Sequence, residues 1–419
     1  MLKKLFSSLS IQIFIGILLG VLVGSYFGSY YGSEFGNKVS ALGDLGKIVI
    51  QLIKAAATPL LFFVVMYSII TSDIGGKLGV KLFFITGFNG LCALAIGVGL
   101  SKFLRPGDHF KKFTPQPLKG EVAKYVARGD KIDFLESFKS YFPESLFKPF
   151  IENNILSLII VAILFGLAFR SILKNGNENE KVLVNKLANW ILLFQKMFEI
   201  CLVWLVRLIP IAVFGVVAMT IGSSGFDTIK GLSIYLGVGL LGLFLHIAII
   251  YHGWLLAKGY SIREFWRTVY PTITYGIGVN SSLATLPLTL KSLDELKVSK
   301  KCATLGACIG TNLNNDGILL YEGMAVFFVA QAMGIEMSAI DHINIALVCI
   351  IGTIGIAGIP EAGFITLAIV LTTLKLPTDI LGMLLAVDWI LGRGRTVTNV
   401  LGDMIVSIAL DENHKKKTA

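Results

Sequence analysis

The chain has 419 residues, of which 54% are hydrophobic and only 15% are charged. Soluble domains carry roughly 25% charged residues, so this composition excludes a soluble globular enzyme. The net charge of +10 does not indicate a nucleic-acid-binding protein. Lys and Arg instead gather in short connections and near the chain ends, as the positive-inside rule expects of a membrane protein. We therefore predict an all-α polytopic membrane protein.

Long apolar blocks in the first part of the chain predict membrane spans, each near or above the roughly 20 residues that a crossing helix needs. Spans one to six are predicted over residues 11–31, 45–72, 82–102, 151–173, 187–221 and 234–256. A polar stretch over residues 105–149 is predicted to be extracellular. Lys3 and Lys4 precede the first span and basic residues 415–417 follow the last. Both termini are therefore predicted to be cytoplasmic.

The second part of the chain, residues 268–410, has apolar blocks interrupted by Gly, Pro, Ser, Thr and Asn. Such interruptions are tolerated in a membrane where the backbone lines a cavity or is buried in protein. Residues 270–290, turning around Asn280-Ser281-Ser282, and residues 343–374, turning around residues 357–360, indicate two re-entrant helical hairpins. Each hairpin precedes a longer helix, an order that suggests an inverted repeat. Ordinary kinked spans are the alternative interpretation.

The last predicted helix carries polar residues on one face. At roughly 100° per residue, an arc of about 80° contains Asp388, Arg395, Asn399 and Asp403. Thr396 widens this stripe, and Arg393 points away from it. Intramembrane charges normally face a partner or a water-filled path, so Arg395 is predicted to bind a carboxylate. Asp403 with Asn399 offers oxygen atoms to a small cation. A structural ladder of ion pairs between helices is the alternative.

The seventh helix begins with clustered amides over residues 310–317. The glycines and amides there predict an unwound segment whose backbone carbonyls could bind Na⁺, and a buried amide network is the alternative. Ser281 and Ser282, at the start of a short helix, suggest an anion site. No nearby histidine activates either serine as a nucleophile. The five cysteines show no paired spacing, so neither a disulfide framework nor a zinc site is expected.

These motifs, in this order, resemble the dicarboxylate/amino acid:cation symporter family, which includes the excitatory amino acid transporters. The matching motifs are Ser-Ser-Leu-Ala-Thr-Leu-Pro from Ser281, Asn314-Asn315-Asp316-Gly317, Ala357-Gly358-Ile359-Pro360, and Arg395-Thr396 with Asn399 and Asp403. The resemblance implies eight transmembrane helices plus two re-entrant hairpins, an elevator mechanism and a homotrimer. It implies a scaffold of residues 1–81 and 150–225, a transport domain of residues 82–104 and 226–413, an extracellular loop at 105–149 and a cytoplasmic tail at 414–419.

The resemblance also implies site residues. A substrate pocket would comprise Arg395, Thr396, Asn399, Ser281, Ser282, Gly392, Ile318, Gly358, Ile359 and Pro360. One Na⁺ site would comprise Gly310, Asn314, Asn399 and Asp403, and a second would comprise Asn312, Thr353, Ile354 and Ile356. Asn89 with Asn314 and Asp316 could form a modified third site. Glu322 matches a position at which proton-coupled members carry Glu, so it is a candidate proton carrier, with a neutral structural Glu as the alternative.

Three departures from the family pattern bear on the substrate. Gly392 stands where amino-acid-transporting members have an Asp that holds the substrate ammonium. Ile318 replaces a Thr that bonds the substrate, and Asn315 replaces a Met. Glu361, at the second hairpin tip, either reaches the pocket mouth or is solvated.

The sequence thus predicts a secondary active symporter that couples uptake of a small carboxylate to Na⁺ and/or H⁺, without a cofactor. Gly392 favours a C4-dicarboxylate over an acidic amino acid. Neutral amino acids or another organic anion are alternative substrates, and an anion-conducting or non-transporting relative is an alternative class. An enzyme is not expected. The protein is expected in the plasma membrane, which would be the inner membrane of a bacterium.

Overall fold

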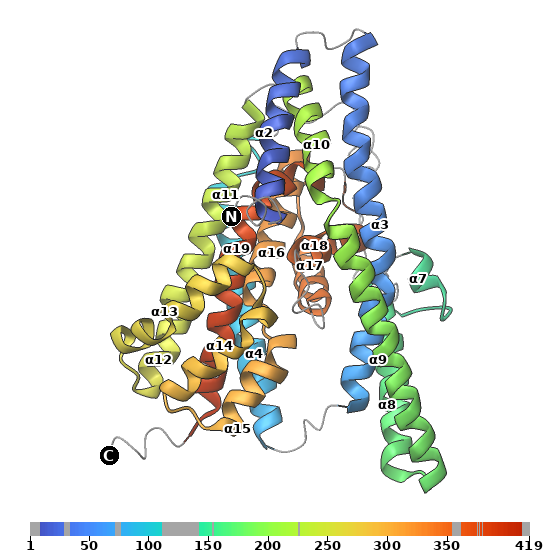
Figure 1. The fold of residues 1–419 in the computed structure, drawn as a ribbon, viewed down its shortest axis with the longest axis vertical. Coiled ribbons are helices and arrows are strands. Elements are labelled where there is room, and N and C mark those ends of the chain that lie inside the picture. Colours follow the sequence, from blue (N-terminus) through green and yellow to red (C-terminus); the bar gives the residue numbers. More distant parts are fainter. Residues whose placement is uncertain are drawn as a thin grey trace, which may run out of the picture.

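In the computed structural model, every element is helical among the residues that the structure describes (Figure 1). The described residues are 9–28, 34–71, 77–110, 142–152, 155–224, 227–353, 362–374, 376, 378 and 380–412. Six of the described helices are long and apolar enough to cross a membrane. These findings confirm an all-α protein of membrane-spanning character.

The first group of helices packs around α3 (Glu34–Thr71). α3 lies against α8 (Ile155–Asn175), α9 (Glu178–Val206) and α10 (Ile209–Ser224), and α7 (Lys148–Glu152) adjoins α8. α10 also packs closely on α2 (Leu9–Gly28). A Cβ atom at Gly16, Gly20 or Gly24 would lie within 2.8 Å of a backbone oxygen of α10. Small residues at this four-residue spacing let two membrane helices approach closely.

The apolar block at residues 187–221 was predicted to be one span, and this prediction is wrong. The chain forms α9 up to Val206 and starts α10 at Ile209. Pro210 lies in the first turn of α10, where its missing N–H costs nothing but prevents continuation of the preceding helix. Hydrophobicity alone does not register such a break.

The second group of helices surrounds α16 (Asp316–Met333), every residue of which is buried. α16 lies between α4 (Lys77–Leu104) and α19 (Leu381–Leu410) and also contacts α11 (Asp227–His246). α11 continues through a π-helical turn (Ile247–Tyr251) into α12 (His252–Lys258), which ends at Gly259 in the left-handed conformation. Figure 1 shows this group beside the one around α3.

The predicted first hairpin is formed by α13 (Ile262–Val279) and α14 (Ser282–Glu295), which pack on each other and on α19. The hydroxyl oxygens of Thr272 and Ser292 lie 2.8 Å apart and join the two arms. In the second hairpin, α17 (Ala339–Gly352) packs on α18 (Ala362–Thr373). These two helices also contact α16 and α8, so they connect the two groups.

The helix before α16 is broken as predicted. α15 (Lys300–Ala303) passes into a π-helical turn (Thr304–Ile309) and a 3₁₀ turn (Gly310–Asn312). Regular helix resumes only at Asp316. The intervening residues therefore present backbone and amide groups in the interior of the protein, next to α19.

Candidate functional site

The guanidinium of Arg395 forms a buried ion pair within α19. Its Nη1 and Nη2 atoms donate to Oδ1 and Oδ2 of Asp388 at 2.6 and 2.8 Å. The two side chains are only 4% and 1% exposed. The ring of Tyr321 lies beneath the guanidinium, with its centroid 4.1 Å from Cζ. The predicted stripe thus contains an ion pair, but within one helix. A substrate carboxylate could take the place of the Asp388 carboxylate on this planar fork.

Gly392 lies on the same face of α19 as this ion pair. A Cβ atom at position 392 would lie 3.3 Å from Nη2 of Arg395 and 3.3 Å from Nδ2 of Asn280. The missing side chain leaves room for the Arg395 side chain to run along the helix towards Asp388. Gly392 therefore contributes space, and Arg395 uses that space to pair with Asp388.

The tip of the first hairpin reaches this face of α19. Thr396 Oγ1 donates to Oδ1 of Asn280 at 2.9 Å. Asn280 ends α13 in the left-handed conformation, with φ of 49°, which Asn adopts more readily than most residues. Ser281 then caps α14, since its Oγ accepts the N–H of Ala284 at 3.3 Å. Ser282 is the first residue of α14, so both serines lie at the hairpin tip as predicted.

The start of α16 packs directly on α19 beside Arg395. A Cβ atom at Gly317 would lie 2.7 Å from the carbonyl oxygen of Arg395. The N–H of Gly317 donates to Oδ1 of Asn399 at 2.9 Å. Ile318, the next residue, is 4% exposed. The close contact between the two helices places the amide-rich segment next to the Arg395 ion pair.

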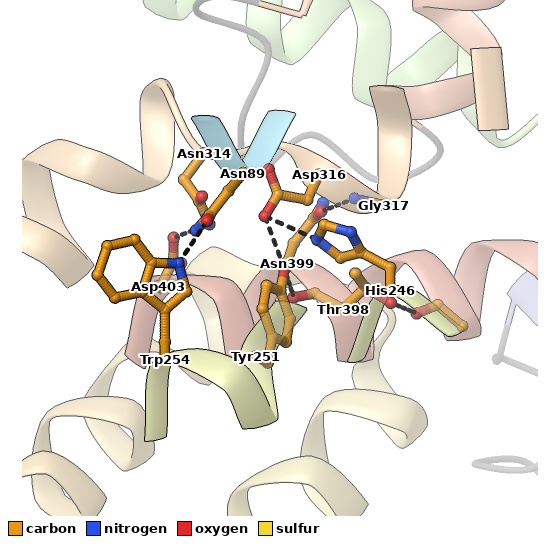
Figure 2. Close-up of polar contacts among 11 residues, drawn as sticks. Asn89, His246, Tyr251, Trp254, Asn314, Asp316, Gly317, Thr398, Asn399 and Asp403 are labelled. Atoms are coloured by element: carbon orange, nitrogen blue, oxygen red, sulfur yellow. Dashed lines mark hydrogen bonds and ion pairs between the residues drawn. The ribbon is translucent and has the colours of Figure 1, made fainter. Parts of the chain in front are cut away.

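Asn314, Asn399 and Asp403 are brought together as predicted for the first Na⁺ site (Figure 2). Asn314 Nδ2 donates to Asp403 Oδ1 at 3.5 Å, and Asn314 Oδ1 is buried without a partner among the described residues. An orphaned amide oxygen beside a buried carboxylate supplies the hard oxygen donors that Na⁺ requires. The carbonyl of Gly310 accepts the N–H groups of Leu313 and Asn314, so it shapes the turn that presents Asn314.

Of the four residues predicted to form the second Na⁺ site, the structure describes Thr353 and the backbone of Asn312. Thr353 is 3% exposed, and its carbonyl oxygen accepts Nδ2 of Asn315 at 2.9 Å. This hydrogen bond joins the amide-rich segment to the end of α17, and the backbone of Asn312 lies in the same segment. Outside the described residues lie Ile354, Ile356, Gly358, Ile359, Pro360 and Glu361.

A hydrogen-bonded network surrounds Asp316, where a third cation site was considered (Figure 2). His246 Nε2 lies 3.2 Å and the Tyr251 hydroxyl 2.8 Å from Oδ2 of Asp316. Trp254 Nε1 donates to Oδ1 of Asn89 at 2.8 Å, and Asn89 Nδ2 is buried without a partner among the described residues. Asn89 thus turns a nitrogen, not an oxygen, to the interior. Oδ1 of Asp316 is buried without a partner among the described residues, so a cation site at Asp316 stays a prediction, with Asn89 presenting no oxygen to it.

Sequence reasoning missed His246, Tyr251 and Trp254. They project from α11, the π-helical turn and α12, and π-helical turns inside longer helices frequently mark functional sites. A usable signal was present, because an ionisable residue inside a span is a functional candidate by default. The predicted sixth span, residues 234–256, contains two histidines, His246 and His252.

Glu322 is fully buried in α16. Its carboxyl lies near Thr366 of α18 and Cys349 of α17. It is also close enough to the Arg395 guanidinium to interact with its charge. The proton-carrier candidate therefore lies between the second hairpin and the α19 ion pair. This position is compatible with a Glu322 that carries a transported proton and with a Glu322 that stays neutral throughout.

Apolar helices long enough to cross a membrane enclose a buried ion pair, an orphaned amide oxygen and a hairpin tip, an arrangement typical of a membrane transport protein. The sodium:dicarboxylate symporter family model matches residues 9–413, and the chain belongs to this family. The resemblance read from the motifs is thereby confirmed. The family is one of transporters, which also confirms that the protein is not an enzyme.

Several curated relatives are C4-dicarboxylate transport proteins. The chain is 28% identical over 374 residues to the one of Xylella fastidiosa, covering 88% of this chain and 81% of the relative. It is 28% identical over 381 residues to that of Bacillus subtilis, covering 89% and 87%. It is 28% identical over 415 residues to C4-dicarboxylate transport protein 3 of Ralstonia nicotianae, covering 98% and 89%.

Proposed function

We propose that this protein is a secondary symporter that takes up a C4-dicarboxylate together with Na⁺, H⁺ or both. The names of the relatives support the substrate class. The observation that carries the proposal is the buried fork of Arg395, which pairs with one internal carboxylate and has no second acid at Gly392. A dicarboxylate brings the anion that this fork binds, and it brings no ammonium that would need an acid at position 392.

In this proposal one substrate carboxylate replaces Asp388 on Arg395, and Thr396, Asn399 and the tip serines line the rest of the pocket. Gly358, Ile359 and Pro360 of the second hairpin complete it. Asn314, Asn399 and Asp403, with the turn at Gly310, would hold one Na⁺, and residues around Thr353 a second. The positive charge of the ions offsets the negative charge of the substrate in a site of low polarity. Glu322 would carry a proton.

The arrangement of the two helix groups supports an elevator mechanism. α3, α8, α9 and α10 pack mainly on one another and on α2, whereas α4 and α19 pack on α16. The site residues on α14, α16 and α19 belong to the second group, so movement of that group as a unit would carry the substrate with it. We further propose a homotrimer in the bacterial plasma membrane with both termini in the cytoplasm, built on the first group as scaffold.

Reconstitution into proteoliposomes tests the function. Labelled succinate should accumulate above its external concentration when an inward Na⁺ or H⁺ gradient is imposed, and the accumulation should collapse with an ionophore. Arg395→Cys should abolish uptake. Arg393→Cys is the matched control, because Arg393 bonds the carbonyl of Trp389 and stacks on its ring, outside the site. Equilibration without accumulation would indicate a channel, and normal uptake by Arg395→Cys would refute the role of Arg395.

A further inference from the structure

α11 passes closely along α19 beside the buried ion pair. A Cβ atom at Gly239 of α11 would lie 2.7 Å from Cδ2 of Leu391. About one turn further along both helices, a Cβ atom at Gly394 would lie 2.8 Å from Cδ1 of Leu243. The contacts therefore advance in the same direction on the two helices. Tyr235 precedes Gly239 by about one turn, so it faces the turn of α19 that carries the acid of the ion pair.

The hydroxyl of Tyr235 has no role in the sites predicted from the sequence. Tyr235 is 0% exposed, and Tyr321 of α16 is 1% exposed. Neither hydroxyl makes a hydrogen bond of regular geometry with a described residue. Each nevertheless lies close to the other and to the carboxylate of Asp388. Buried hydroxyls are normally hydrogen-bonded, so two unsatisfied donors beside one carboxylate require an explanation.

Substrate binding creates a need for such donors. In the proposed function, a substrate carboxylate takes the place of Asp388 on Arg395. The displaced carboxylate stays buried, and a buried charge without a partner strongly destabilises a protein. A phenolic O–H can donate to a carboxylate, and a hydrogen bond to an ionised acceptor is stronger than one between neutral groups. Tyr235 and Tyr321 offer two donors, one for each oxygen of the displaced carboxylate.

We propose that Tyr235 is a positioning residue of the transport site, which together with Tyr321 receives the Asp388 carboxylate when a substrate occupies Arg395. The two hydroxyls are unsatisfied in the substrate-free protein and become satisfied when substrate binds, so they favour the bound state. The role brings α11, which carries none of the predicted substrate residues, into substrate binding. This inference rests on the proposed function.

Tyr235→Phe removes the hydroxyl and keeps the ring, which packs on Phe328 with the ring centroids 4.6 Å apart. Binding of labelled succinate to the purified protein in Na⁺ buffer should weaken roughly tenfold, the effect of losing one hydrogen bond to a charged group. The unfolding temperature of the substrate-free protein should not fall, because no hydrogen bond is lost in that state. Tyr260→Phe is the matched control. It alters another buried tyrosine, beside Asp411 past the end of α19, and should leave succinate affinity unchanged.

The same substitution in an Asp388→Asn background shows whether Tyr235 acts through the Asp388 carboxylate. The neutral amide of that variant leaves no charge to be received when substrate binds. Tyr235→Phe should therefore change succinate affinity by less than about threefold in this background, since two residues that act through one interaction are not additive. A tenfold loss of affinity in both backgrounds would show that Tyr235 acts independently of Asp388 and would overturn this inference.

Unchanged succinate affinity in Tyr235→Phe would also overturn this inference and leave the proposed function intact. A weaker affinity together with a lower unfolding temperature of the substrate-free variant would assign the hydroxyl to the fold instead. An effect of Tyr321→Phe without one of Tyr235→Phe would place the receiving donor on α16 alone. Absence of succinate binding and uptake in the wild type would overturn the proposed function, and this inference with it.

Discussion

Asp388 and Arg395 form a two-point ion pair along one face of α19, with hydrogen bonds of 2.6 and 2.8 Å and almost no exposure to solvent. In such a buried pair, each charge is already neutralised by the other when no substrate is bound. It follows that a dicarboxylate must compete with Asp388 for the guanidinium. The affinity of the site then depends on the difference between the two carboxylates, rather than on Arg395 alone.

The first prediction concerns this competition. Asp388→Asn keeps the size of the side chain and leaves the buried guanidinium without a counter-ion, which typically costs about 3–5 kcal/mol. We expect a lower unfolding temperature without substrate and a larger stabilisation by succinate than in wild type. Thermal unfolding of the purified protein with and without succinate measures both. Asp294→Asn, an exposed residue of α14, is the control, and a variant that behaves like wild type in both respects would contradict the competition.

The second prediction concerns Gly392. Gly392→Asp places a carboxylate near Arg395 Nη2 and Asn280 Nδ2, where it can bind an ammonium group and also compete for Arg395. We expect the affinity for aspartate relative to succinate to rise tenfold or more, equivalent to about 1.4 kcal/mol. Competition against labelled succinate uptake gives this ratio. Gly392→Asn has the same size without the charge, so an equal gain in that variant would show that charge is not the cause.

The extent to which these features follow from sequence differs from residue to residue. The stripe from Asp388 to Asp403 and the broken helix before Asp316 follow from helical periodicity and from the composition of the segment. The ion pair within α19 does not, because periodicity places Asp388 and Arg395 on one face without telling which partner each selects. Likewise, the contact of Asn280 with Thr396 joins residues 116 positions apart, which no local pattern encodes. Pro210 could have indicated the end of a helix, but the continuous hydrophobicity of residues 187–221 led to the prediction of a single span.

The third prediction concerns the first Na⁺ site. Asp403→Asn removes the carboxylate beside the orphaned oxygen of Asn314. We expect the Na⁺ concentration for half-maximal succinate uptake to rise at least tenfold, because the cation loses its only anionic ligand in this cluster. Titration of uptake with Na⁺ at constant ionic strength measures it. An unchanged Na⁺ requirement would contradict the site, whether or not uptake becomes slower.

Asn89 offers a contrasting fourth prediction. Its oxygen accepts the indole N–H of Trp254 and its nitrogen has no partner among the described residues, so Asn89 itself is expected to bind no ion. Asn89→Ala should leave the Na⁺ requirement within twofold of wild type. It should lower stability by about 1 kcal/mol, because the indole N–H of the partly buried Trp254 loses its acceptor. A large rise in the Na⁺ requirement would show that Asn89 binds a cation after all.

The last prediction concerns the end of α19, where Asp411 holds the helix in place. Its carboxylate accepts the N–H of Ser299 at 2.8 Å, and its carbonyl accepts Lys258 Nζ at 2.9 Å. Asp411→Ala removes the first bond, so we expect a loss of about 1 kcal/mol, measured by thermal unfolding at pH 7. Glu412→Gln is the matched control, since Glu412 is exposed and its pair with Lys81 is screened by solvent.

The hydrogen bond from Lys81 lowers the pKa of Glu412. Any stabilisation from this pair is therefore complete above the unfolded pKa of Glu, about 4.3, and is lost as the pH falls through the lower folded pKa.

The loss of stability caused by Asp411→Ala should exceed that caused by Glu412→Gln at pH 7, because a buried acceptor is harder to replace by water than an exposed ion pair. Equal losses in the two variants would mean that Asp411 contributes no more than a surface charge.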